Sequence, residues 1–262
     1  WDNAAKLAEE VKAQDILKVA GKVNLYQGRR QIVVEAAAKV PEGLAAIDRF
    51  LPSTVYDVNR LHEDMVALFS SLEDPFAKKL ALETLQDPDV KRRMLRAPAA
   101  KTVHHAYAGG LIEHSLSVCR ILDQMARHYQ NYYGKAVSRD LMLLGGLFHD
   151  IGKIYELSFE RGTEYTKEGQ LIGHHVQGCE LVDKVAAKIA DFPNDLKVHV
   201  KHMILAHHGK LEYGSPKLPH SLEALIVHYV DDLDSKVNTI LGFIAADNSP
   251  GEFTANHRLF EH

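Results

Sequence analysis

From about residue 53 onward, apolar residues recur at the three- and four-residue spacing of amphipathic helices. Prolines and glycines such as Pro75, Pro88, Gly134 and Gly152 separate the apolar segments from one another. The pattern predicts helices over residues 54–71, 75–85, 87–95, 109–132, 138–150, 171–191, 193–208 and 219–243. Residues 155–166 interrupt it and predict a short hairpin around Arg161-Gly162. The larger part of the chain is therefore expected to be an all-α helical bundle.

The first 40 residues follow a different pattern. A short helix is predicted over residues 3–13, followed by two strands that join at a turn containing Gly28. Because a lone two-stranded hairpin is only marginally stable in water, we expect it to pack on the rest or to pair with strands upstream of this sequence, and we favour the second. Three regions are expected: residues 1–40, a linker over 41–53, and a helical domain over 54–262.

Composition narrows the class of protein. With 46% hydrophobic and 25% charged residues, the chain is typical of globular proteins. No apolar run approaches the ~20 residues of a membrane span, and the sequence shows no signal-peptide pattern, so a cytoplasmic protein without a membrane partner is expected. Cys119 and Cys179 are far apart, which argues against a disulfide framework. The net charge of −4 means that a nucleic-acid partner would need a local basic patch.

Several of the 16 histidines fall at apolar positions of the predicted helices. Helical counting places His114, His174 and His207 each in a row of apolar residues, so that each points toward the core. A single inward histidine is more often a hydrogen-bonded core residue than a ligand. Three of them, contributed by separate helices, need a common partner for their lone pairs, and a divalent metal ion supplies one.

Charged residues also occur inside the apolar segment 141–157, which contains His149, Asp150 and Lys153. The pair His149-Asp150 precedes Gly152, where a helix can end, and at a helix terminus both side chains can reach one point. His207-His208 precedes Gly209 in the same way. A mixed set of nitrogen and oxygen ligands favours manganese, iron, cobalt, nickel or zinc over calcium.

The last long helix should supply a further carboxylate from Asp231, Asp232 or Asp234. Counting places one apolar stripe along this helix, made of Leu222, Ile226, Val230, Leu233, Val237 and Ile240. Asp231 lies nearly opposite that stripe, beside other apolar residues, so periodicity alone leaves the three aspartates open.

In this order, His114, His149-Asp150 and Asp231 resemble the H…HD…D pattern of HD-domain metal-dependent phosphohydrolases. The additional His174 and His207-His208 resemble the longer pattern that holds two metal ions. The segments APAAKTVHHAYAGGLIEHSLSV, HDIGKIYEL, LIGHHVQG, LAHHGKLEYGSP and EALIVHYVDDLDSKV are similar to the YhaM-type 3′–5′ exoribonucleases, in which an OB-fold precedes the HD domain. The chain has HHGKLEYGSP where cyclic-dinucleotide phosphodiesterases carry a Gly-Tyr-Pro triplet, which argues against that activity.

The resemblance implies an HD-domain bundle preceded by the last strands of a truncated OB-fold, and it selects Asp231 as the ligand. We assign His114, His149, Asp150 and Asp231 to one ion, and Asp150, His174, His207 and His208 to the other. Manganese or iron is expected first, with cobalt, nickel or zinc as alternatives. The two ions would activate a water for in-line attack on phosphorus. Asp150 is thus expected to act in catalysis as the bridge between them.

Lys153 is the second candidate for catalysis, because it lies one turn beyond Asp150 and can bind a phosphoryl oxygen. The alternative is an ordinary solvated lysine. The residues expected to bind substrate are Arg96, Lys101, His104 and His105. Arg96 and Lys101 belong to a run of basic residues over 91–101 that could track a phosphate backbone. Such a run is more often just a solvated helix face.

Three functions remain at this point. The first is a 3′–5′ exonuclease acting on single-stranded RNA, with DNA as an alternative substrate. The second is a phosphohydrolase of small nucleotides or phosphomonoesters. The third is a non-catalytic regulatory module with bound metal. Self-association into a homo-oligomer is left open in all three.

Overall fold

The computed structural model describes residues 11–12, 15–41, 44, 50–134, 137–159, 162–249 and 251–256. The chain forms two compact units, residues 1–52 with 160–162, and residues 53–159 with 163–262. Of the helix predicted over 3–13, only residues 11–12 are described, so that prediction lies almost wholly outside the described residues.

The first unit contains the expected hairpin. Strands β1 (Leu17–Tyr26) and β2 (Arg29–Lys39) pair antiparallel, with Tyr26 opposite Arg29 and an irregularity at Ala20/Gly21. Its apolar residues remain largely exposed, as Val23 (73%) and Leu25 (67%) illustrate.

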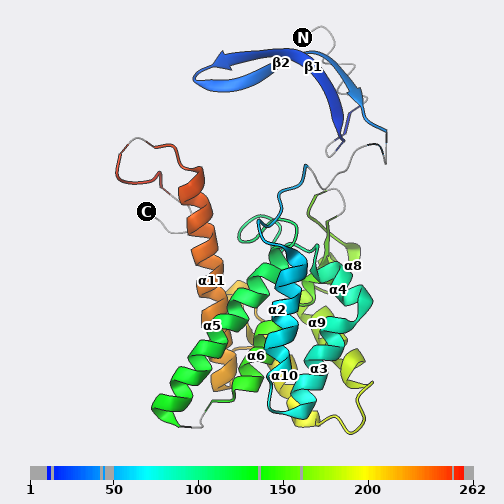
Figure 1. The fold of residues 1–262 in the computed structure, drawn as a ribbon, viewed down its shortest axis with the longest axis vertical. Coiled ribbons are helices and arrows are strands. Elements are labelled where there is room, and N and C mark those ends of the chain that lie inside the picture. Colours follow the sequence, from blue (N-terminus) through cyan, green and yellow to red (C-terminus); the bar gives the residue numbers. More distant parts are fainter. Residues whose placement is uncertain are drawn as a thin grey trace. The chain divides into compact units, whose positions relative to one another are not determined.

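The second unit is helical (Figure 1). Its elements are α2 (Val58–Ser70), α3 (Pro75–Gln86), α4 (Pro88–Met94), α5 (Gly110–Tyr133), α6 (Arg139–Phe148), α7 (Lys153–Glu156), β3 (Leu157–Ser158), β4 (Glu164–Tyr165), α8 (Lys167–Leu171), α9 (His174–Ala186), α10 (Asn194–Ala206), the 3₁₀ turn η2 (Leu211–Tyr213) and α11 (Leu222–Ala246). The helical bundle is confirmed. The strands β3 and β4 pair antiparallel where the short hairpin was predicted.

Two of the predicted helix boundaries follow from Asp-Pro pairs. Asp74 and Asp87 are N-caps whose carboxylates accept backbone N–H groups of the first turn, and the following prolines occupy the first helical position. The helix predicted over 171–191 is present as α9, but it is shorter than predicted. The backbone ends α8 at Leu171 and starts α9 at His174, because Gly173 takes a positive φ of 80° that a helix cannot continue through.

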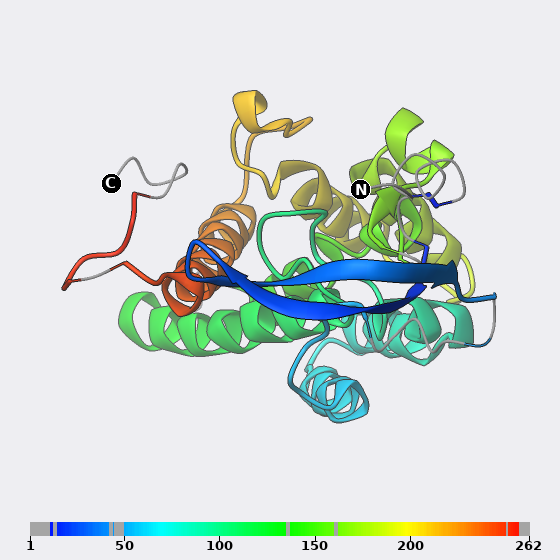
Figure 2. The same cartoon turned by 90° about the horizontal axis from the view of Figure 1, so that it is seen from above.

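Helix α6 lies at the centre of the bundle, where it contacts α5, α10 and α11. Two adjacent glycines allow this approach. A Cβ at Gly145 would lie 2.7 Å from Met203 Sδ and Val227 Cγ2, and one at Gly146 would lie 2.8 Å from Leu122 Cδ1. The C-terminal end of α6 is therefore surrounded by other helices. Figures 1 and 2 show α11 alongside α5, so residues from both helices can approach that end.

Candidate metal centre

The end of α6 is the point where the predicted ligands meet. His149 caps the helix and Asp150 follows it, and both side chains are almost fully buried. His114 reaches the same place from the buried face of α5, and Asp231 reaches it from α11. One ligand atom from each of these four residues lies within 4.8 Å of the others.

The distances between these atoms are short. His114 Nε2 lies 3.2 Å from His149 Nε2 and 3.1 Å from Asp231 Oδ1. Asp150 Oδ2 lies 3.8 Å from His114 Nε2 and 3.5 Å from His149 Nε2. Two imidazole nitrogens and two carboxylates thus surround one point, as a mixed nitrogen and oxygen site requires.

Asp150 also faces a second set of nitrogens. Its other oxygen, Oδ1, lies 3.4 Å from His207 Nε2 and 3.8 Å from His174 Nε2. His174 stands at the start of α9 and His207 caps the end of α10, with His208 next to it. The two oxygens of one carboxylate therefore point at two separate groups of imidazoles.

The start of α9 is held close to Asp150. Glu156 Oε1 accepts hydrogen bonds from the backbone N–H of His174 and from its Nδ1. The backbone at Gly152 also packs directly on α9, because a Cβ there would collide with the carbonyl group of His174 and lie 2.8 Å from Gly178 N. The chain after Asp150 therefore fixes where the second set of histidines begins.

The histidines share one hydrogen-bonding pattern that fixes their ring orientation. Each donates its Nδ1–H to a nearby acceptor, which leaves the Nε2 lone pair free in a neutral ring. The acceptors are Asp234 Oδ2 for His114 (2.8 Å), Gly146 O for His149 (2.9 Å), Glu156 Oε1 for His174 (3.0 Å), Ile204 O for His207 (2.7 Å) and Tyr213 O for His208 (3.0 Å). Such second-sphere bonds are typical of metal-binding histidines.

The structure separates the three aspartates of α11. Asp231 faces His114 and His149, whereas Asp234 lies behind His114, where it accepts from Nδ1 and from the Ser117 hydroxyl. Asp232 is paired with Lys236 at 2.7 Å on the exposed side. Asp231 is therefore the aspartate of α11 that reaches the cluster.

Unpaired buried atoms test whether an ion fits here. Asp150 Oδ1, His174 Nε2, His175 Nε2 and His207 Nε2 are buried without a hydrogen-bond partner in the described part of the chain. Buried polar atoms are nearly always paired, since leaving one unpaired costs about 1–3 kcal/mol. All four atoms are acceptors or can be, so a bound cation satisfies them together. The donor set fits divalent metal.

The charge state of the cluster follows from burial and neighbouring charges. Burial opposes a proton on His114, but hydrogen bonds to Asp231 and Asp234 outweigh it and raise the pKa of this imidazole to about 9. Burial also disfavours a charged Asp150, yet Lys153 and His149 hold the pKa of its carboxyl well below the usual value. Asp150 is thus a carboxylate at neutral pH, and metal binding must displace a proton from His114.

On the other side of Asp150, burial lowers the pKa of His207. Burial is also the main cause that lowers the pKa of His208, to about 3. Both imidazoles are therefore neutral at physiological pH, as ligands must be.

Lys153 is buried rather than solvated, with 9% of its surface exposed. Its Nζ donates to Asp150 Oδ2 at 2.7 Å. It also lines a cavity of about 210 Å³, whose walls are His104, Asp150, Lys153, His207, His208, Tyr213, His228, Asp231, Asp232 and Ser235. A positive charge therefore stands beside the Asp150 carboxylate and faces the cavity.

The four residues expected to bind substrate are divided by the structure. His104 lines the cavity, and the buried His105 packs against His114 with its ring centroid 5.2 Å away. Lys101 is instead paired with Glu164 at 2.7 Å, and the guanidinium of Arg96 lies over the Phe159 ring. Arg96 and Lys101 are thus outside the cavity wall, because the segment before α5 packs on the β3–β4 region. Only His104 reaches the cavity itself.

Sequence reasoning missed several residues of the site. His175 joins the second group of imidazoles, and Tyr213 and His228 line the cavity. His228 Nδ1 donates to the carbonyl of His207 at 2.7 Å and so holds the end of α10. The adjacent histidines in GHHVQG carry the same signal as His207-His208 and point to His175.

Comparison with known proteins agrees with this geometry. The sequence model of the HD domain matches residues 111–236, which include every residue of the two groups on either side of Asp150. His104 and His105 lie before the matched range. The fold and the site therefore define an HD-domain protein, a class of hydrolytic enzymes that implies divalent-metal binding. No solved structure matches the chain significantly.

Curated relatives define the family more narrowly. The chain is 31% identical over 261 residues to the 3′-5′ exoribonuclease YhaM of Oceanobacillus iheyensis, covering 99% of this chain and 79% of the relative. It is 32% identical to the YhaM of Bacillus subtilis (97% and 78%) and 31% identical to that of a Geobacillus species (97% and 76%). The chain belongs to the YhaM family. In the described ranges, no helix is long and apolar enough to span a membrane.

Proposed function

We propose that this protein is a 3′–5′ exoribonuclease that hydrolyses single-stranded RNA at a dinuclear metal centre. The observation that carries the proposal is the position of Asp150, whose Oδ2 faces His114 and His149 while its Oδ1 faces His174 and His207. One carboxylate between two imidazole groups is the arrangement that a two-metal hydrolase needs. The names of the YhaM relatives supply the reaction and its direction.

The residues that would hold the first ion are His114, His149, Asp150 and Asp231. Asp150, His174, His207 and His208 would hold the second. Manganese or iron is the expected occupant, with cobalt, nickel or zinc as alternatives. When bound, the ions lower the pKa of a coordinated water and offset charge on the phosphoryl oxygens.

The protein residues around this centre have their own tasks. Lys153 is held by Asp150 with its ammonium group at the cavity, where it binds a phosphoryl oxygen as a point charge. Burial and the charge of Lys153 lower the pKa of His104 to about 3, so this imidazole is neutral and contributes a hydrogen bond rather than a positive charge. Asp234 and Glu156 keep the histidines oriented.

The cavity wall supports a nucleotide as the ligand. Tyr213 lines the cavity yet is 57% exposed, and Lys210 Nζ lies 4.9 Å from its ring centroid. Single-stranded nucleic acid is typically bound by an exposed aromatic ring, on which a base stacks, together with cations that bind phosphate. Tyr213 offers such a ring, and Lys153 lies on the wall of the same cavity. We assign Tyr213 to the terminal base and Lys153 to the scissile phosphate. The β1–β2 hairpin fits the last strands of an OB-fold within residues 1–40, with a linker at 41–53 and the HD domain at 54–262.

The test is an RNA degradation assay with the full chain. A 5′-labelled single-stranded RNA in Mn²⁺ should yield a ladder shortened from the 3′ end, and Asp150→Asn should abolish it. Asp195→Asn, at an exposed position of α10, is the matched control and should leave the ladder unchanged.

The same assay separates the alternatives. Cleavage of mononucleotides or phosphomonoesters without shortening of RNA would replace the proposal with a small-nucleotide phosphohydrolase. Equal shortening of a DNA strand of the same sequence would widen the substrate to DNA. Absence of any hydrolysis by metal-loaded protein would leave only a non-catalytic module and refute the proposal.

A further inference from the structure

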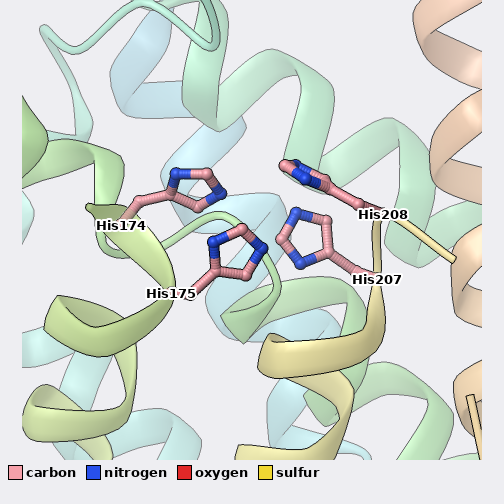
Figure 3. A group of neighbouring side chains, drawn as sticks. All are labelled: His174, His175, His207 and His208. Atoms are coloured by element: carbon pink, nitrogen blue, oxygen red, sulfur yellow. The ribbon is translucent and has the colours of Figure 1, made fainter. Parts of the chain in front are cut away.

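Four histidine rings meet on the second side of Asp150. His174 and His175 extend from the start of α9, and His207 and His208 extend from the end of α10 (Figure 3). One ring nitrogen from each lies within 4.8 Å of the others. His175 has no place in the ligand set of the proposed function, yet its ring centroid is 4.1 Å from that of His174 and 4.9 Å from that of His207.

The ring nitrogens that face this pocket lack partners. Nε2 of His174, His175 and His207 is buried in each case, without a hydrogen-bond partner among the residues for which the structure gives positions. His175 itself is only 9% exposed. An imidazole kept from water in this way is satisfied only by something that enters the pocket.

The neighbours of His175 can offer only lone pairs to such a ligand. The Nδ1–H groups of His174, His207 and His208 are already donated to Glu156, Ile204 O and Tyr213 O. Their Nε2 atoms are therefore acceptors. A water has two hydrogens for this group of acceptors, whereas one cation satisfies all of them.

The two sides of Asp150 differ in chemistry. The first group combines two imidazoles with two carboxylates. The second group is made of four imidazoles, two of which, His174 and His207, have Nε2 within 3.8 Å of Asp150 Oδ1. Carboxylate oxygens suit manganese, whereas imidazole nitrogens favour later first-row metals such as zinc and nickel. Two such pockets should not select the same ion with equal strength.

We propose that His175 is a fourth imidazole ligand of the second ion, and that this pocket discriminates for zinc over manganese more strongly than the first pocket does. The inference rests on the proposed dinuclear centre and adds to it a ligand and a difference between its two ions. One protein then holds zinc on the α9–α10 side and manganese on the α5–α11 side.

The experiment measures metal content rather than activity. Metal-free full-length protein is given one equivalent of Zn²⁺ and excess Mn²⁺, and bound metals are counted by mass spectrometry after desalting. One zinc and one manganese per chain are expected. Asp231→Asn should keep the zinc and lose the manganese. His175→Gln should keep the manganese and weaken zinc binding by about tenfold or more, the scale of losses at metal sites.

His199→Gln is the matched control, because it removes an exposed histidine of α10 and should change neither metal. Circular dichroism of the metal-free variants checks that each one folds. If His175→Gln does not fold, wild-type protein with one equivalent of Co²⁺ still decides the question. Paramagnetically shifted imidazole N–H signals in its proton NMR spectrum should come from four histidines, and signals from three would refute the ligand.

The outcomes separate the two proposals. Zinc affinity unchanged in His175→Gln, or zinc distributed equally over both pockets, would overturn this inference and leave the dinuclear hydrolase intact. Protein that binds neither metal under any condition would overturn the proposed function itself.

Discussion

Replacement of Gly152 by alanine tests whether backbone packing after Asp150 builds the metal centre. Gly152 follows Asp150 by two positions, and its Cα faces the first turn of α9. A Cβ there would lie 2.8 Å from Gly178 N and would collide with the carbonyl group of His174. Both are backbone atoms, which cannot rotate away as the end of a side chain can.

The geometry sets the size of the effect. Ordinary contacts of a Cβ begin at 3.4 Å, so α9 must move by at least 0.6 Å relative to residue 152, and by more to clear the carbonyl group. Overpacking of this kind costs about 1–3 kcal/mol of unfolding free energy. His174 and His175 move with α9, and a displacement near 1 Å at a catalytic site costs about 10²-fold in rate.

Urea unfolding and RNA degradation measure the two effects in Gly152→Ala. The matched control is Gly242→Ala in α11, where a Cβ would meet nothing within 4 Å among the described residues. There, alanine should stabilise the helix by about 0.5–1 kcal/mol and leave the rate unchanged. A Gly152→Ala protein with wild-type stability, metal content and rate would show that α9 does not begin against this residue, and the account of the second pocket would fail.

Further predictions concern metal binding, substrate and pH. Asp234→Asn should lower Mn²⁺ affinity by about 10–100-fold, measured by titration calorimetry, because His114 loses the carboxylate that orients it; unchanged affinity would exclude this orienting role. Removal of metal with a chelator should lower the melting temperature of the wild-type protein, since ions at about 100 times their Kd add about 2.7 kcal/mol to native stability. The same treatment should not change the melting temperature of an Asp150→Asn protein, which has already lost its metal. Tyr213→Ala should raise KM for RNA with little change in kcat, whereas Tyr213→Phe should keep the wild-type KM, since the ring alone stacks on the base. Equal KM in the wild type and both variants would remove Tyr213 from the binding site. Burial disfavours a charged Asp123, but hydrogen bonds from Arg127 and Arg139 outweigh it and hold the pKa of the carboxyl below 3.8. Its stabilising contribution is therefore present above pH 3.8 and is lost as the pH falls through the lower folded-state pKa. Asp123→Asn should accordingly cost about 1.5–3 kcal/mol at pH 7 and progressively less as the pH falls below 3.8 by urea unfolding. A cost independent of pH would contradict this assignment.

Local sequence determined the helices and much of the candidate metal centre. Asp74-Pro75 and Asp87-Pro88 start helices because a carboxylate caps the first N–H groups and proline fits the first turn. His114 lies on the buried side of α5, as expected, because the apolar residues of this helix recur along one face that includes His114. His149 and Asp150 follow the end of α6 and converge there, as expected from the breaker at Gly152.

Only the tertiary structure decided which face of helix α11 is buried against its neighbours. Of the apolar stripe predicted for α11, only Ile226 and Val230 are buried. The prediction is wrong for the other members, which are exposed: Leu222, Leu233, Val237 and Ile240. An apolar helix with several candidate faces has no local signal that selects one, and packing against α5, α6 and α10 makes the choice.

The same limit applies to the site residues that sequence reasoning misplaced or missed. Asp231 and Asp234 both reach His114, but they do so from opposite sides of its ring, which depends on where α5 crosses α11. Lys101 is turned toward Glu164 and away from the cavity by long-range packing. His175 points into the second pocket because α9 is anchored at Gly152 and Glu156, contacts that involve residues distant in sequence from α9. Sequence fixes which groups a helix can offer, and three-dimensional contacts decide which of them meet.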